Sequence, residues 1–411
     1  RPTSGGRATI FALSSGQGKC GVAVIRTSGP ASGTAVLGLT TLRALPQPRV
    51  ATLRLLQDPG SSEPLDKGLI LWFPGPHSFT GEDCAEFHVH GGPAVVSAVL
   101  GALGSIPGLR PAEAGEFTKR AFQNGKLSLT EVEGLGDLIH AETEAQRRQA
   151  LRQLQGELGQ LCQGWGETLT TFVALIPPPA VDRTVQGLRE ALLAHLQDAR
   201  RGQRLRSGAH VVIAGPPNAG KSSLINLLSR RPVAIVSPEP GTTRDVVESA
   251  VDIGGFPALL SDTAGLRDSP DLVEQEGVRR AQDRLAQADV VLALLDATDL
   301  ASASSRHFLE TVVTPGGPST PSRRILLVLN KTDLLPEGPR PALPPHLLLS
   351  CKTEAGLEAV LASLKRELAT VCGDPTTGPP ILTRARHRHH LQSCCEALGR
   401  YEQSKDLALA A

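Results

Sequence analysis

The segment Gly215-Pro-Pro-Asn-Ala-Gly-Lys-Ser222 constrains the fold of this chain more than any other feature. Its pattern fits a phosphate-binding loop, in which backbone N–H groups and a helix N-terminus surround phosphates. The apolar run 209–214 before it predicts a strand, and residues 223–228 predict the start of a helix. In this context Lys221 is expected to reach the β- and γ-phosphates, and Ser222 to ligate Mg²⁺. For the segment taken alone, a chance glycine-rich turn is the alternative.

Two further motifs follow predicted strands. Asp262-Thr-Ala-Gly265 comes after the apolar run 258–260, where an Asp can hold the magnesium shell and a Gly N–H can sense the γ-phosphate. Asn330-Lys-Thr-Asp333 comes after the run 325–329. An Asp at that position accepts hydrogen bonds from the ring N–H and the exocyclic amine of guanine. Adenine lacks this amine, so the motif selects GTP over ATP.

A fourth motif, Ser350-Cys-Lys352, follows the run 347–349 and fits the loop behind the base. Four motifs in this order, each after a strand, predict a guanine-nucleotide domain with a parallel sheet. The residues that these motifs place at GTP are Asn218, Ala219, Gly220, Lys221, Ser222, Ser223, Asp262, Thr263, Ala264, Gly265, Asn330, Lys331, Asp333, Ser350, Cys351 and Lys352.

Composition limits the class of protein. A chain of 411 residues can hold two or three domains, and its 40% apolar and 20% charged residues are typical of globular proteins. No apolar run approaches the length of a membrane span. The net charge of +1 means that any nucleic-acid site must be a local patch. Seven scattered cysteines without metal-ligand spacing indicate reduced thiols. Because the sequence begins at Arg1 and contains no Met, we expect a processed product, a fragment or an edited chain.

Four segments are expected along the chain. Residues 1–125 form an α+β domain, 126–207 are helical, 208–373 form the α/β nucleotide domain, and 374–411 are helical again. The stretch 131–161 has few helix breakers and apolar residues three and four apart, which predicts helical structure. We expect the last segment to pack with the middle helices, so that the nucleotide domain is inserted in a helical domain. In the first segment, strands are predicted over 8–13, 21–25, 51–56, 69–73 and 84–89, and a helix over 93–103.

Further segments narrow the class of GTPase. They are Ser78-Phe-Thr-Gly-Glu-Asp83, His90-Gly-Gly-Pro93, Gly115-Glu-Phe117 and Gly241-Thr-Thr-Arg-Asp245, together with Asn218 in the phosphate loop. Over nearly the whole chain, in the same domain order, the sequence resembles the tRNA-modifying GTPase family known in bacteria as MnmE or TrmE. Among its members, the sequence is most similar to the mitochondrial counterpart. The resemblance implies a multidomain fold whose amino-terminal domain forms a homodimer and binds 5-formyl-tetrahydrofolate.

The resemblance also implies an activity and partners. The GTPase would be activated by K⁺ and by face-to-face dimerisation. With an FAD-dependent flavoprotein partner, it would modify carbon 5 of the wobble uridine of tRNA. The group added would be of the taurinomethyl or carboxymethylaminomethyl type, with taurine used in mitochondria. The implied location is the mitochondrial matrix, with no transit peptide in this sequence.

A potassium site is expected on chemical grounds as well. Leu266 stands where a Ras-like GTPase has a water-positioning Gln, and a leucine cannot do that work. A K⁺ ion held by neutral oxygens can neutralise charge that develops between the β- and γ-phosphates. Asn218 could instead be a loop-capping residue. By resemblance, the K⁺ ligands are Asn218, Ser237, Glu239 and Thr242, with backbone carbonyls serving at Ser237 and Glu239. Thr243 joins Ser222 in the Mg²⁺ shell, and both Thr242 and Thr243 contact GTP.

The resemblance assigns Glu274 to the positioning of the attacking water, with Lys221 as the second catalytic residue. A solvated glutamate is the alternative for Glu274. Arg26, Glu86 and Lys126 match folate-binding positions. Arg26 would pair with a folate carboxylate, and Glu86 would accept from the pterin amine, although a buried ion pair would give the same pattern.

Two other polar groups leave alternatives open. His88 and His90 have the i, i+2 spacing of metal ligands, but without a third ligand nearby they are expected to be strand residues. The basic run 384–390 could contact tRNA phosphates, or form the polar face of a helix.

The sequence departs from the family in two places. The family's Cys-x-Gly-Lys tail is absent before Ala411, and Ile176-Pro-Pro-Pro179 interrupts a helical stretch, since prolines cannot continue a helix. We therefore expect a shortened, partly broken helical domain and retained GTP hydrolysis, with tRNA modification in doubt. The competing hypotheses are a GTP-regulated ribosome or membrane assembly factor, which would need no folate pocket, and a modification-incompetent isoform.

Overall fold

The computed structural model describes residues 8–175, 178–229, 249–262, 284–313, 324–335, 343–373, 375 and 381–404. The chain divides into two compact units, residues 1–132 and 133–411. Several residues with a role expected from the sequence lie outside the described residues: Ser237, Glu239, Thr242, Thr243, Thr263, Ala264, Gly265, Leu266 and Glu274.

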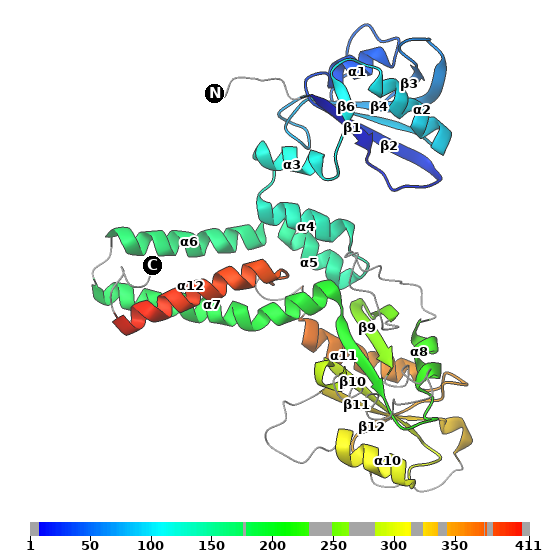
Figure 1. The fold of residues 1–411 in the computed structure, drawn as a ribbon, viewed down its shortest axis with the longest axis vertical. Helices are drawn as coiled ribbons and strands as arrows, with labels where there is room; N and C mark the ends of the chain where they lie inside the picture. The colour runs from blue at the N-terminus through cyan, green and yellow to red at the C-terminus, as the bar shows by residue number, and fades with distance from the viewer. Residues whose placement is uncertain are drawn as a thin grey trace, which may run out of the picture. The chain divides into compact units, whose positions relative to one another are not determined.

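The first unit contains a six-stranded sheet with the order β3-β4-β5-β2-β1-β6 (Figure 1). Every pairing is antiparallel except that of β1 with β6. All five predicted strands and the predicted helix are present, with shifted ends. The elements are β1 Thr9–Leu13, β2 Cys20–Ser28, α1 Ser32–Gly38, β3 Thr52–Gln57, β4 Pro64–Phe73, β5 Cys84–Gly91, α2 Pro93–Gly104, β6 Leu109–Pro111 and α3 Glu116–Gln123.

One face of this sheet forms the core of the first unit. Ile25, Ile70 and Phe87, from neighbouring strands, are fully buried and pack with Val36 of α1 and Leu103 of α2. Because side chains alternate along a strand, their neighbours in sequence project to the opposite face. That face carries the polar residues of β2 and β5 described below.

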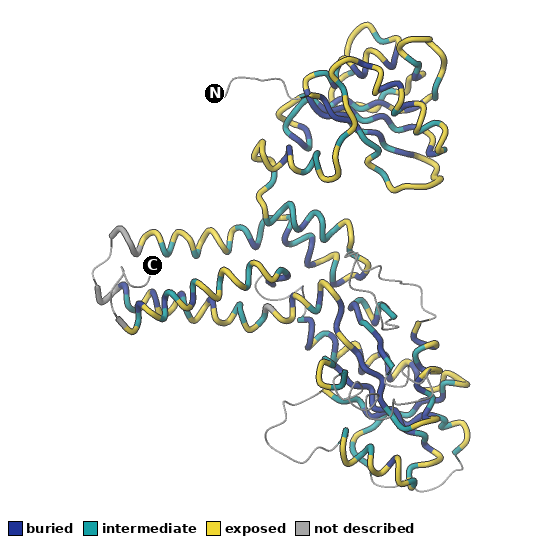
Figure 2. Tube along the Cα trace, viewed as in Figure 1, coloured by how far each residue is buried: buried dark blue, intermediate teal, exposed yellow. Residues whose placement is uncertain are grey.

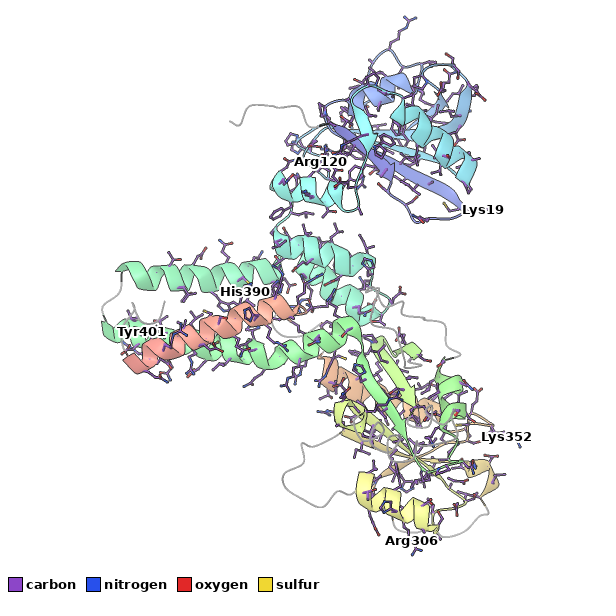
Figure 3. All side chains as sticks on the ribbon, in the orientation of Figure 1. Lys19, Arg120, Arg306, Lys352, His390 and Tyr401 are labelled. Atoms are coloured by element: carbon purple, nitrogen blue, oxygen red, sulfur yellow. The ribbon has the colours of Figure 1, made fainter. Side chains whose placement is uncertain are left out.

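Helix α3 is held to the sheet by Arg120, whose side chain is only 4% exposed (Figure 3). Its guanidinium donates to Glu82 at 2.9 Å, to Glu116 at 3.0 Å, and to the carbonyl oxygens of Ala8 and Ser28 at 2.9 and 3.3 Å. A buried charge is tolerated when partners surround it in this way.

The second unit begins with three helices that cover the predicted helical stretch 131–161, which is interrupted at two places. Thr143 starts a new helix with a capping box, because its side chain accepts from Gln146 N while the Gln146 side chain accepts from Thr143 N. Gly156, at φ +89°, separates this helix from the next. The helices are α4 Leu129–Ile139, which crosses the division between the units, α5 Glu144–Leu154 and α6 Glu157–Leu175.

The helical stretch is interrupted at the prolines 177–179, as predicted. Helix α6 ends at Leu175, and α7, Pro178–Ser207, starts directly on the second proline and runs for 30 residues. Proline is tolerated in the first turn of a helix because the N–H it lacks has no partner within the helix there.

Helix α12, Ala385–Ser404, lies along α7, as expected for the carboxy-terminal segment (Figures 1 and 2). Val185 and Leu192 of α7 share a buried cluster with Leu398 and Tyr401 of α12. The Tyr401 hydroxyl donates to Asp182 at 3.2 Å.

The nucleotide-binding part is a six-stranded sheet with the order β12-β11-β10-β7-β9-β8. All pairs are parallel except β8 with β9. The central strands β7 and β10 are almost wholly buried, and β11 is buried over its last four residues, as parallel strands covered on both faces require. The strands are β7 Ala209–Ala214, β8 Ser249–Ile253, β9 Phe256–Asp262, β10 Val290–Asp296, β11 Arg324–Asn330 and β12 His346–Leu348. The helices are α8 Lys221–Ser229, α10 Ala303–Phe308, the π-helix η1 Leu309–Val313, the 3₁₀ turn η2 Thr332–Leu334 and α11 Leu357–Cys372.

Across the described ranges, none of the helices combines the length and apolarity needed to cross a membrane.

Candidate nucleotide-binding site

The phosphate loop joins β7 to α8 in a conformation that its glycines make possible. A Cβ added to Gly215 would lie 2.1 Å from the Leu294 carbonyl oxygen. Gly220 has φ +97°, and a Cβ there would lie 2.3 Å from Asn330 Nδ2. Asn218 is exposed and left-handed at φ 63°, a conformation that Asn adopts more readily than most residues. The loop therefore has the close backbone packing that a phosphate cradle requires.

Lys221 begins α8 and is buried within the loop. Its ammonium donates to the carbonyl oxygens of Gly215 at 3.0 Å and Pro216 at 2.9 Å. Ser222 and Ser223 follow in the first turn of the helix and are exposed. A lysine, a hydroxyl and a helix N-terminus thus gather at the end of β7, which fits a nucleotide phosphate chain with Mg²⁺.

Asn330, at the end of β11, ties the phosphate loop to the base-binding loops. Its Nδ2 donates to the Ala219 carbonyl at 2.9 Å, and its Oδ1 accepts from Cys351 N at 3.0 Å. Because Asn330 is 2% exposed, these bonds replace water and fix the side chain. One residue therefore connects three of the four motifs.

Asp333 is exposed and accepts from the buried Ser350 hydroxyl at 2.7 Å. The same hydroxyl accepts from Thr353 N at 3.1 Å. Ser350 thereby orients the carboxylate that is expected to read guanine. Lys352, labelled in Figure 3, lies exposed beside this loop.

Lys331 has a left-handed backbone at φ 65° and forms an ion pair with Asp296, at the end of β10, over 2.6 Å. Burial raises the pKa of Asp296, but the hydrogen bonds and charge from Lys331 and the bonds from Thr298 outweigh it, so the pKa is lowered. Asp296 and Asn330 are register partners in β10 and β11. The pair therefore fixes the backbone next to the base-binding motif.

Asp262 ends β9, in register with Ile213 of β7, so it lies beside the start of the phosphate loop. Its carbonyl oxygen accepts from Arg284 at 2.7 Å. The structure thus brings the described residues of all four motifs to the carboxyl ends of the parallel strands, where ligands of open α/β sheets bind.

Of the three predicted folate residues, Arg26 and Glu86 contact one another, and Lys126 contacts a neighbouring loop. The Arg26 guanidinium donates twice to Glu86 Oε1, from Nε at 3.0 Å and Nη2 at 2.8 Å. It lies 5.2 Å from the centroid of the Phe79 ring and 5.8 Å from that of Phe117. Lys126 donates to the Pro76 carbonyl at 3.2 Å, so it contacts the loop that carries Phe79.

His88 and His90 contact carboxylates along the sheet. His88 Nε2 lies 3.2 Å from Glu86, and His90 Nδ1 lies 2.8 Å from Asp66. No group of three or more potential metal ligands occurs among the residues that the structure describes. Both histidines lie in β5, as expected for strand residues.

Much of the basic run 384–390 is engaged in contacts with α4. Arg384 pairs with Asp137 at 2.8 Å, and Arg386 pairs with Glu133 at 2.6 Å. His387 Nε2 lies 3.2 Å from the second oxygen of Glu133. Burial raises the pKa of Glu133, but these cations outweigh it and lower the pKa. The helix-face interpretation is therefore favoured for these three residues.

Sequence reasoning missed the acidic partners Glu133 and Asp137, and also Gln149 and Gln153 of α5, which are 4% and 1% exposed. Glutamines usually lie on the surface, and the pattern of α5 carries no signal of their burial.

Comparison with known proteins supports the same assignment. Residues 9–126 match the family described as "GTP-binding protein TrmE N-terminus", and residues 210–331 match "50S ribosome-binding GTPase". The chain is 69% identical to the human "5-taurinomethyluridine-[tRNA] synthase subunit GTPB3, mitochondrial", over 100% of this chain and 88% of that protein. It is 55% identical to the protein of that name from Danio rerio, over 98% of this chain and 86% of the relative. It is 47% identical to the "tRNA modification GTPase MnmE" of Rhodospirillum rubrum, over 95% of this chain and 89% of the relative. With identity of this level over nearly its full length, the chain belongs to the MnmE (TrmE) family of tRNA modification GTPases.

Proposed function

We propose that this protein hydrolyses GTP in order to modify carbon 5 of the wobble uridine of tRNA, with a taurinomethyl or carboxymethylaminomethyl group. The observation that carries the proposal is the joining of a GTPase site to a TrmE-type amino-terminal unit in one chain. The relatives named as 5-taurinomethyluridine-[tRNA] synthase subunits support the taurine form. The protein is a GTPase of the tRNA modification class.

The chemistry at the phosphates is assigned as follows. Lys221 neutralises the β- and γ-phosphates, and Ser222 and Thr243 hold Mg²⁺, which stabilises charge on the phosphate oxygens. Glu274 positions the attacking water. Asn218, Ser237, Glu239 and Thr242 provide the K⁺ ligands. The exposed, left-handed Asn218 beside the loop supports this role, because its amide oxygen is not buried in the protein.

The folate, proposed to be 5-formyl-tetrahydrofolate, would bind at Arg26, Glu86 and Lys126. Arg26 and Glu86 pair with one another, and the Arg26 guanidinium lies near the rings of Phe79 and Phe117. An Arg–Glu pair beside aromatic rings fits a flat, polar-edged ligand with a carboxylate. Ligand binding would exchange the Arg26–Glu86 ion pair for contacts with the ligand.

The partners are tRNA, an FAD-dependent flavoprotein and a second copy of this chain, and the location is the mitochondrial matrix. Relatives named as mitochondrial subunits of a synthase support the location and the need for a partner subunit. The proposed domains are 1–125 for dimerisation and folate, 126–207 and 374–411 for the helical domain, and 208–373 for GTP hydrolysis.

The test is mass analysis of wobble uridines in cells that lack the protein. The modified uridine should disappear and return on expression of the wild type, but not of Lys221→Ala. Lys119→Ala, at an exposed lysine of α3 that belongs to no motif and no proposed site, is the control and should restore the modification. Normal wobble uridines together with defective ribosome assembly would instead identify an assembly factor, which needs no folate pocket.

A further inference from the structure

Helix α5 contacts the nucleotide-binding part at two places near its N-terminus. Ala145 N donates to the Gly255 carbonyl, in the turn between β8 and β9, at 3.0 Å. Gln146 Nε2 donates to the Arg206 carbonyl at 3.0 Å, in the last turn of α7 before the chain enters β7. The Ala145 side chain is 5% exposed and belongs to the core of the nucleotide-binding sheet. The first turn of α5 thus contacts both the last turn of α7 and the β8–β9 turn of the nucleotide-binding sheet.

The following turns of α5 bind the segment by which the chain leaves the sheet. Gln149 Nε2 donates to the Ile381 carbonyl at 3.1 Å, and Arg152 Nη1 donates to the Pro375 carbonyl at 2.8 Å. The Thr383 hydroxyl lies 3.5 Å from Gln153 Oε1. Because Gln149 and Gln153 are nearly fully buried, these bonds are shielded from water and expensive to break. Helix α5 therefore binds both chain crossings, that is, the segment by which the chain enters the nucleotide-binding sheet and the segment by which it leaves.

The β8–β9 hairpin links the first turn of α5 to the GTP site. Gly254 and Gly255, at φ +61° and +96°, form its turn, and β9 runs from there to Asp262. Seven residues of strand span roughly 23 Å. Strand β8 bonds to β9 and stands at the edge of the described sheet. A rearrangement at Asp262 can be passed along β9 to the turn, because β8 is bonded to β9 and no further strand of the described sheet lies outside it.

We propose that the first turn of α5 senses the nucleotide state through the Gly255 carbonyl. When the hairpin shifts, Ala145 N loses its acceptor, one of the few available to a helix N-terminus. Because Gln146 is the next residue of the same turn, a shift of this turn also disturbs its Nε2 bond to the Arg206 carbonyl. The change reaches both chain crossings through α5, which links GTP binding to the arrangement of α7 and α12. By linkage, a change in α5 must in turn alter the relative affinities for GTP and GDP.

The direct test is amide hydrogen exchange of the whole protein with Mg²⁺ and K⁺, with GDP or with a non-hydrolysable GTP analogue. The Ala145 amide should exchange at rates that differ at least tenfold between the two states. Amides of the β7 strand provide the internal control and should not change. Equal exchange of Ala145 in both states, with the phosphate-loop amides responding to nucleotide, would overturn the proposal.

A variant separates coupling from simple support. Gln146→Glu keeps the oxygen that accepts from Glu142 N and Thr143 N, but removes the donor to Arg206. We expect the ratio of affinities for the GTP analogue and GDP to change roughly fivefold or more. Arg148→Ala, which removes only an exposed pair with Glu144 on the same helix, should leave the ratio within twofold. If Gln146→Glu weakens both nucleotides equally, α5 is a static support and the proposal fails.

Discussion

At the scale of single residues, the guanine end of the site depends on one carboxylate held by Ser350. We predict that Asp333→Asn lowers GTP affinity on the order of 10²-fold and shifts preference towards xanthine nucleotides. The physical reason is that the new amide donates where the guanine amine also donates, whereas xanthine offers a carbonyl there. Calorimetric titration with both nucleotides measures the shift. Asp299→Asn, at an exposed aspartate after β10, is the control, and unchanged GTP affinity in Asp333→Asn would show that the motif is misassigned.

Glu116 makes the stability of the first unit depend on pH. Hydrogen bonds from Arg110, with those from Glu113 N and Arg120, outweigh burial and lower its pKa to about 2 from an ordinary value of 4.5. A lowered folded-state pKa adds stability that is present above pH 4.5 and is lost as the pH falls towards 2. We predict that Glu116→Gln destabilises the unit by about 1–3 kcal/mol at neutral pH, and that the difference narrows below pH 4.5.

Hydrogen exchange of peptides from β2 and β5 measures this difference against pH. Glu144→Gln, followed in peptides of α5, is the matched control, because hydrogen bonds from Arg147 and Arg148 lower the pKa of Glu144 to about 2 as well. Its side chain is 46% exposed, so solvent screens the pairs and the effect should be smaller. A Glu116→Gln difference that stays constant from pH 7 to pH 2.5 would contradict the assignment.

At the scale of elements, the sequence predicted strands well where motifs or alternation marked them. The strands before the four nucleotide motifs appear at the expected places, because a parallel strand buried on both faces reads as a continuous apolar run. The break at Thr143 was missed, since a capping box inside a helical pattern resembles ordinary helix sequence. The buried glutamines Gln149 and Gln153 could not be predicted either, because their hydrogen-bond partners Ile381 and Thr383 lie more than 200 residues away.

Two glycines of α7 give a prediction at the same scale. A Cβ at Gly202 would lie 2.1 Å from the Leu382 carbonyl, where the segment that leaves the sheet crosses the helix. We predict that Gly202→Ala destabilises the second unit by about 1–3 kcal/mol, because backbone must move to make room. Gly187→Ala is the control: its Cβ would meet nothing within 4 Å, so it should stabilise α7 by up to about 1 kcal/mol. Thermal unfolding of the two variants checks the opposite signs, and equal shifts would mean that the crossing is not tightly packed.

At the scale of the whole molecule, hydrolysis should depend on two copies of the chain and on potassium. The loop residue Asn218 is exposed and left-handed, so a second molecule or an ion can reach it. A charge that is set in place before reaction, between the β- and γ-phosphates, is worth roughly 10²–10³-fold in rate. The protein would gain that charge from K⁺ when two nucleotide-binding parts meet face to face.

We therefore predict that GTP turnover per molecule rises with protein concentration in potassium and stays low and flat in sodium at equal ionic strength. Asn218→Ala should abolish the difference between the two salts, while Asn226→Ala, at an exposed asparagine of α8, should preserve it. Phosphate release over a hundredfold range of protein concentration is the measurement. Equal turnover in both salts would contradict the proposed potassium site. If potassium raises turnover equally at every protein concentration, the potassium site stands but the face-to-face contact is contradicted, because the ion is then held within one copy.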